Sequence, residues 1–226
     1  NKEAPTLSDY FETPEEAVRH YGYLKQVYQS ISAKEVYSSY VFPWDCVVLT
    51  RSDVVLKMAY IAWMTNDIRL REELCTYLPA LESYNRASYI GIVLARTESK
   101  VEQEYVLQSL GDRSADIRDE AYKVLSEMSL SPEQYQHIEE LLRFKYSEMR
   151  INAINLLMKQ PEAQLAASIR RLLSDKNAER RLAGLDMMKS IRNVDFLKDS
   201  YQKLLSTVRE IQKPNAKEKI LIESLI

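Results

Sequence analysis

A side-chain pattern that recurs every 31 or 32 residues is the strongest constraint on the fold of this chain. It is marked by Arg86, Arg118, Arg150 and Arg181, with successive spacings of 32, 32 and 31 residues. A regular spacing of this length is typical of repeat proteins, in which each unit buries its apolar face against its neighbours. Such arrays usually present binding surfaces, so the pattern indicates a class of function without naming a partner.

The residues around each arginine predict a pair of helices. Apolar residues three, four, six and seven positions after the arginines form a wide stripe on one face of a helix that begins near each arginine. Leucines stand eight residues before the arginines and aliphatic residues twelve before, which places both on one face of a preceding helix. The third position after the arginine holds Ala121, Ala153 and Gly184 in three units, which suits a close approach of two helix backbones. Tyr89 departs from this rule in the first unit.

Composition and local signals agree with helices joined by short connections. The 226 residues include only four glycines, so an all-α fold is expected and there is little to build a sheet. The segments Thr13-Pro14-Glu15-Glu16 and Ser131-Pro132-Glu133-Gln134 read as helix starts, each with a capping residue before a proline. Helices are predicted over 15–31 and 54–64, whereas the intervening 37–49 is interpreted as a loop or a buried helix start.

Two segments, 110–125 and 172–188, resemble HEAT repeats. In both, an aspartate precedes the arginine by six residues, as Asp112 precedes Arg118 and Asp175 precedes Arg181; Phe144 replaces the aspartate in the unit of Arg150. The resemblance covers about residues 68–192 and implies an α-solenoid of stacked antiparallel helix pairs with the right-handed stacking of HEAT and armadillo superhelices. Because the period is shorter than the roughly 40–47 residues of standard HEAT units, the repeats are HEAT-like.

This resemblance suggests three regions. Residues 1–67 would form an irregular helical N-terminal cap or the end of a preceding domain, 68–192 about four helix pairs, and 193–226 a further, truncated pair. The chain begins with Asn1 and ends within an apolar run, as an excised fragment or a processed chain would.

The repeated aspartates and arginines are predicted to be structural. An arginine at the same place in successive units can tie neighbouring turns together by charge-assisted hydrogen bonds. The residues assigned to this ladder are Asp112, Arg118, Arg150, Asp175 and Arg181.

The HEAT resemblance also implies a binding face. In related arrays the second helix of each pair lines the concave side, so the solvent-side positions of those helices are the expected contacts. These positions are Asp119, Glu120, Lys123, Asn152, Asn155, Asp186 and Lys189. Their mixed charges suit a protein or peptide partner better than a polyanion. The function predicted from the sequence is therefore a non-catalytic protein-interaction scaffold.

A basic cluster supports the main alternative, a nucleic-acid partner. Seven basic residues against three acidic ones lie between Ile169 and Arg192, and the anion-binding candidates among them are Arg170, Arg171, Lys176, Arg180 and Arg192. HEAT-like alkylpurine DNA glycosylases are all-helical proteins of similar size. If this chain is of that type, the basic patch would be the surface that faces DNA. The overall formal charge of −2 argues against it. A helper protein of the bilin-lyase type, with similar repeats, is a second alternative.

No set of residues indicates catalysis, a metal or a cofactor. The two histidines, His20 and His137, have no ligand-spaced partners, and no glycine-rich phosphate loop is present. Cys46 and Cys75 make no metal-binding spacing and are expected to be reduced, as in a cytoplasmic protein. No stretch approaches the ~20 apolar residues of a membrane span. Oligomeric state is left open.

Tyrosine is the surplus residue type. Fourteen of the fifteen tyrosines precede residue 147, with Tyr10, Tyr21, Tyr28, Tyr37 and Tyr40 close together in the sequence. An exposed tyrosine cluster would favour partner recognition, and the other interpretation is that the rings are wedged between helices.

Overall fold

The computed structural model shows a mainly helical chain and describes residues 6–32, 37–42, 45–145 and 147–226. For residues 37–42 and 45–48 only the backbone is described. The contacts divide the chain into two compact units, Asn1–Val124 and Leu125–Ile226, which are treated separately below.

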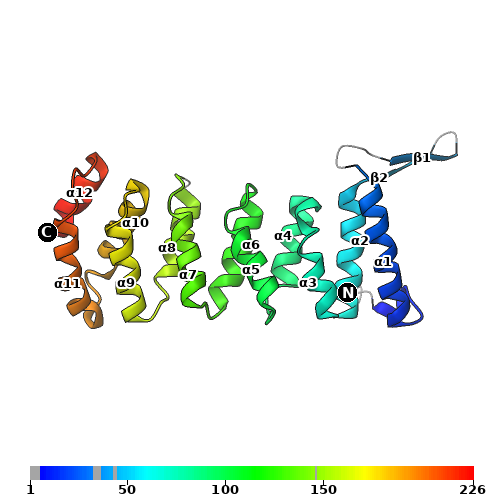
Figure 1. The fold of residues 1–226 in the computed structure, drawn as a ribbon, viewed down its shortest axis with the longest axis horizontal. Helices are drawn as coiled ribbons and strands as arrows, with labels where there is room; N and C mark the ends of the chain where they lie inside the picture. The colour runs from blue at the N-terminus through cyan, green and yellow to red at the C-terminus, as the bar shows by residue number, and fades with distance from the viewer. Residues whose placement is uncertain (1–5, 33–36, 43–44, 146) are drawn as a thin grey trace. The chain divides into compact units, whose positions relative to one another are not determined.

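The first unit combines helices with one hairpin (Figure 1). Its elements in chain order are the 3-10 turn η1 (Leu7–Asp9), α1 (Pro14–Ser30), β1 (Tyr37–Phe42), β2 (Asp45–Leu49), α2 (Arg51–Thr65), α3 (Ile68–Leu74), η2 (Leu78–Ala80), α4 (Ser83–Ile92) and α5 (Lys100–Ser109), followed by the start of α6 (Ala115–Glu127). Helices α1 and α2 pack against each other, α2 against α3, and α3 against α5. Ala17 and Tyr21 of α1 and Val54, Val55 and Met58 of α2 are buried in this core.

The capping signals read from the sequence are present. The Thr13 hydroxyl accepts a hydrogen bond from the backbone N–H of Glu16 at 3.2 Å, and Pro14 occupies the first helical position of α1. At Ser131 the hydroxyl accepts from the Gln134 N–H, while the Gln134 side chain accepts from the Ser131 N–H at 2.8 Å. Both prolines occupy the first helical position, where a backbone N–H would have no acceptor within the helix. They therefore begin helices and do not break them.

The segment between α1 and α2 corrects the sequence-based prediction. It is an antiparallel β-hairpin in which Tyr37 lies opposite Leu49, with an irregularity between Tyr40 and Phe42. The loop or helix start predicted for 37–49 was therefore wrong. β-Branched and aromatic residues favour extended backbone, and two short strands suffice to satisfy each other's hydrogen bonds. The side chains of Tyr37 and Tyr40 lie outside the described part of the structure.

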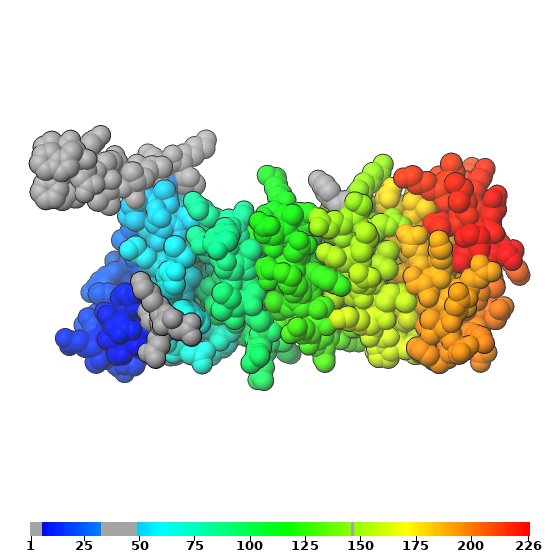
Figure 2. Space-filling model, turned by 180° about the vertical axis from the view of Figure 1, so that it is seen from behind, coloured from blue at the N-terminus to red at the C-terminus, as the bar shows by residue number. Residues whose placement is uncertain are grey.

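The second unit is built from helix pairs in two rows. It contains α7 (Pro132–Leu141), α8 (Ser147–Leu157), α9 (Glu162–Leu173), α10 (Ala178–Ile191), the turn η3 (Asp195–Leu197), α11 (Lys198–Arg209) and α12 (Ala216–Leu225). Along one row α9 packs against α7 and α11, and along the other α10 packs against α8 and α12. Figure 2 shows α11 and α12, in orange and red, side by side.

Helices α9 and α10 approach each other closely at Gly184. A Cβ added at Gly184 would lie 3.1 Å from both the Cβ of Leu172 and the backbone N of Leu173. Leu172, Leu173 and Leu185 are fully or almost fully buried around it. The small residue three positions after the arginine thus stands where α10 meets the end of α9.

Gly184→Ala should therefore destabilise the protein even though alanine is the better helix former. The new methyl group meets backbone that cannot move aside, and overpacking of this kind costs about 1–3 kcal/mol. Gly22, inside α1, is the matched control, because no atom lies within 4 Å of its added Cβ. Gly22→Ala should stabilise by about 0.5–1 kcal/mol. Thermal unfolding followed by circular dichroism measures both, and a gain in stability from Gly184→Ala would contradict the close contact.

Candidate functional site

The recurring arginines make the same local hydrogen bonds in two of the units. Arg118 Nη1 donates to the backbone oxygens of Asp112 and Arg113 at 2.9 and 3.0 Å. Arg181 Nη1 donates to those of Asp175 and Lys176 at 3.0 and 2.9 Å. Because each arginine follows its aspartate by six residues, its guanidinium can donate to the backbone oxygen of that aspartate.

The aspartate side chains organise the same turns. Asp112 Oδ1 accepts from the N–H of Ser114 at 2.9 Å, and Asp175 Oδ1 accepts from the N–H of Asn177 at 2.7 Å. The second oxygen of each carboxylate accepts from an arginine, Arg86 in the first case at 2.9 Å and Arg180 in the second at 3.0 Å. In both of these turns, therefore, the aspartate bonds to a backbone N–H of the turn and to the side chain of an arginine.

Other bonds of these arginines reach the next helix pair. Arg150 Nη2 lies 2.6 Å from Asp186 of α10, and Arg181 Nε lies 2.7 Å from Glu218 of α12. The environments of the two acceptors differ, because the side chain of Glu218 is fully buried whereas that of Asp186 is 40% exposed. Where Phe144 replaces the aspartate, Arg150 also donates to the backbone oxygen of Glu179 at 3.2 Å.

A second set of ion pairs joins first helices and was not foreseen from the sequence. Glu102 of α5 is fully buried and accepts from Nε and Nη2 of Arg71 on α3 at 2.9 and 2.8 Å. Glu139 of α7 is almost fully buried and accepts from Nε and Nη2 of Arg171 on α9 at 3.1 and 2.6 Å. Glu102 also accepts a hydrogen bond from the Thr97 hydroxyl. Bidentate geometry of this kind is the strongest arrangement available to an arginine and a carboxylate.

The difference between Glu218 and Asp186 gives a test of the arginine ladder. Arg181→Ala leaves a buried carboxylate without its cation, which costs about 3–5 kcal/mol. Arg150→Ala should also lower the melting temperature, but by less, because its partners Asp186 and Glu179 are 40% and 27% exposed and water can solvate their carboxylates when the arginine is removed. Chemical denaturation of the two variants in parallel gives the comparison. Equal and negligible losses would show that neither arginine supports the fold.

Three of the five basic residues proposed for an anion site make intramolecular ion pairs or hydrogen bonds, although Arg171 and Arg192 are exposed. Arg171 holds Glu139, and Arg180 lies 3.0 Å from Asp175 and 3.1 Å from Glu140. Arg192 donates to the backbone oxygen of Ser224 at 2.6 Å. Arg170 and Lys176 are exposed. The cluster seen in the sequence is therefore interleaved with carboxylates from α7 and from the turn before α10.

Three residues predicted for the binding face line one groove of the first unit. Asp119, Glu120 and Lys123 of α6, together with Tyr84, Ala87 and Ser88 of α4, surround a hollow of about 400 Å³. Lys123 Nζ lies 2.6 Å from Glu120, which raises the pKa of the lysine. Gly91 leaves room for the Glu120 carboxylate, since a Cβ there would lie 2.5 Å from Oε2. The side chain of Tyr84 is 77% exposed at the edge of the groove.

A comparable groove exists in the second unit. It has a volume of about 390 Å³, and its lining includes Phe144, Arg150, Asp186, Ile220 and Leu221 from α8, α10, α12 and the turn before α8. Of the residues predicted for the binding face, Asp186 lines it. Asn155 and Lys189 are exposed and Asn152 is half-buried, but none of the three lines this hollow.

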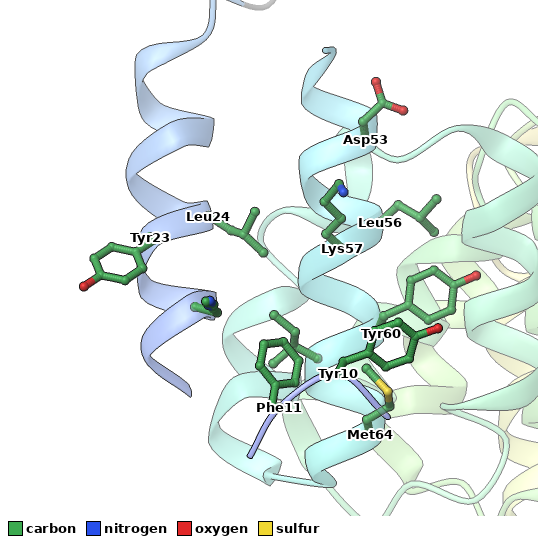
Figure 3. Close-up of a pocket in the computed structure, with 11 residues that line it drawn as sticks. Tyr10, Phe11, Tyr23, Leu24, Asp53, Leu56, Lys57, Tyr60 and Met64 are labelled. Atoms are coloured by element: carbon green, nitrogen blue, oxygen red, sulfur yellow. The ribbon is translucent and has the colours of Figure 1, made fainter. Parts of the chain in front are cut away.

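A larger hollow than these two lies elsewhere, between α1 and α2 (Figure 3). Its volume is about 740 Å³, and it is lined by Tyr10, Phe11, His20, Tyr23, Leu24, Asp53, Leu56, Lys57, Tyr60, Ile61 and Met64. Sequence reasoning missed it, although its three tyrosines, Tyr10, Tyr23 and Tyr60, belong to the surplus noted above. The signal that could have revealed it is α2 itself, whose apolar residues occupy more of the helix surface than one buried face requires.

The described residues contain no group of three or more His, Cys, Asp or Glu side chains that could hold a metal ion. Cys75 is buried, and its burial raises the pKa of the thiol to about 12, so the reactive thiolate is scarce at neutral pH. The helices in the described part of the chain include none that combines the length and the apolar character of a membrane span.

The state of Cys75 can be checked by alkylation at pH 8 in a Cys46→Ser variant. The native protein should react on the order of 100-fold or more slowly than the same protein unfolded in denaturant, because the thiolate is the nucleophile. Similar rates in the two states would mean that the thiol is accessible and activated.

Comparison with known proteins places the chain in a family without assigning an activity. The match to that family, described as a family of unknown function (DUF5724), covers residues 1–226. No curated protein and no solved structure shows significant similarity to the chain. This family match does not by itself show a HEAT-repeat protein. Because the match spans the whole sequence, this chain belongs to the DUF5724 family.

Proposed function

We propose that this protein is a HEAT-like helical scaffold that binds a protein or peptide through its second helices, without catalysis. The observation that carries the proposal is the character of the grooves on those helices. In the first unit the exposed Tyr84 borders Asp119, Glu120 and Lys123, and in the second the exposed Phe144 and Ile220 border an arginine–aspartate pair.

Grooves of this composition resemble the anatomy of protein interfaces. Aromatic and aliphatic side chains in solvent supply apolar contact area, and adjacent charges of both signs supply selectivity. The two-row packing of α7–α12 is the arrangement expected of stacked helix pairs. The ion pairs of Arg171 and Arg180 leave less positive charge for a polyanion than the sequence suggests, so the nucleic-acid alternative gains no support.

The test compares two double charge reversals. Lys123→Glu with Lys189→Glu alters the second helices α6 and α10, and Lys100→Glu with Lys203→Glu alters the first helices α5 and α11 by the same charge. All four lysines are exposed, so folding should be preserved. A partner captured by the wild-type protein at high salt and after nuclease treatment is identified by mass spectrometry, and its affinity for each variant is then measured.

We expect the second-helix variant to lose about tenfold in affinity, a change of about 1.4 kcal/mol, and the first-helix variant to lose less than about twofold. Equal affinities of the two variants for the partner would contradict the proposed face. Capture that disappears with salt or nuclease would instead indicate a nucleic-acid partner, because phosphate contacts weaken steeply as salt rises.

A further inference from the structure

The hollow between α1 and α2 has the size and the lining of a binding site. Its volume of about 740 Å³ falls within the roughly 300–1,000 Å³ of ligand sites. Leu24 projects from α1 towards α2, and Tyr10, Tyr60 and Met64 gather at one end (Figure 3). The tyrosines lie partly in solvent, with Tyr10 64% and Tyr60 49% exposed. The apolar floor is therefore open to an occupant arriving from solvent.

One cation in this hollow, Lys57, forms no close ion pair within the described residues, although it lies near enough to Asp53 to help lower the pKa of that carboxyl. Lys57 forms no ion pair within 4 Å in that part of the structure. The neighbouring Asp53 is occupied, since its Oδ2 accepts from the backbone N–H of Thr50 at 2.8 Å and from the Thr50 hydroxyl at 2.7 Å. These bonds lower the pKa of Asp53, so it stays ionised at the start of α2. The ammonium of Lys57 is thus available to an external anion.

The imidazole of His20 lines the same hollow. Its ring packs edge-on against Phe11, with centroids 5.2 Å apart. Nδ1 of His20 is buried and has no hydrogen-bond partner among the described residues, so this atom is not exposed to an occupant.

We propose that this hollow binds a peptide segment of a partner protein in which a bulky apolar side chain stands next to an acidic one. The apolar side chain would lie between Leu24 and Leu56, and the carboxylate would pair with Lys57. Exposed tyrosines favour a peptide over an enclosed small molecule, because they give contact area with a polar tip at little entropic cost. A single cation beside an aspartate is a poor match for a nucleic-acid backbone.

This site shares no residue with the second-helix grooves, so it can be tested separately from the proposed function. The probe is a phage-displayed library of random 12-residue peptides, selected on the whole protein, with the enriched sequences synthesised and their affinities measured by fluorescence anisotropy. The variants are Lys57→Glu and Tyr60→Ser, both at exposed positions of α2. Lys100→Glu and Phe196→Ser are the matched controls, since both residues are exposed and neither lines one of the hollows described above. Tyr84→Ser shows whether a selected peptide binds the second-helix groove instead, and circular dichroism verifies that every variant is folded.

We expect enriched peptides that combine Leu, Phe or Trp with Asp or Glu. Lys57→Glu and Tyr60→Ser should each weaken their binding about tenfold, and the controls less than about twofold. Replacing the acidic residue of the peptide by lysine should restore binding to the Lys57→Glu variant, as expected for a direct charge pair. Enrichment of basic or purely polar peptides, unchanged affinity in Lys57→Glu, or loss of binding in Tyr84→Ser rather than Tyr60→Ser would overturn the proposal.

Discussion

The ion pairs between consecutive helix pairs are the interaction on which the rest of the structure depends. The helices are short, with ten residues in α4, α5, α7 and α12, and isolated helices of that length are marginal in water. They persist because each packs on its neighbours, so whatever fixes the neighbours fixes the helix. Arg71–Glu102 and Arg171–Glu139 do this between first helices, and Arg150–Asp186 and Arg181–Glu218 between second helices.

These pairs mainly determine which alignment of the helices forms, and they contribute less to the overall stability of the fold. Burying two charges costs desolvation free energy that their attraction only partly returns, so a buried pair adds little net stability relative to apolar residues. A shifted alignment of the helices, however, would leave Glu102 or Glu218 buried without a cation, and that state is strongly disfavoured. Leucine-rich stripes alone would tolerate such shifts, because one apolar contact resembles another. The pairs therefore fix how one helix pair is aligned on the next.

The sequence predicts the arginines better than their partners. Their regular spacing and their place at helix starts identify Arg118 and Arg181, and the turn aspartates follow from the offset of six. Glu102, Glu139 and Glu218 cannot be found in this way, since a glutamate in an amphipathic helix normally faces solvent and nothing in the local pattern marks these three as buried. The hairpin before α2 is missed for a similar reason, because five- or six-residue apolar runs suit strand, loop and helix start alike.

The α1–α2 hollow also could not be predicted from the sequence pattern. Periodicity assigns the apolar residues of α2 to the core, and Val54, Val55 and Met58 are indeed buried, but Leu56, Tyr60 and Met64 on the same helix line the hollow instead. When neighbouring helices cover only part of the apolar surface of a helix, the uncovered part is available to bind a partner. The extent of the uncovered surface is known only from the packing of the helices. The uncovered apolar surface of α2 lies beside Lys57. In contrast, Arg71, Arg86 and Arg181 form ion pairs with carboxylates of the protein itself. Charges used to align helices are not available for recognition, so an unpaired cation beside exposed apolar surface carries more information about a partner than the net charge of the chain.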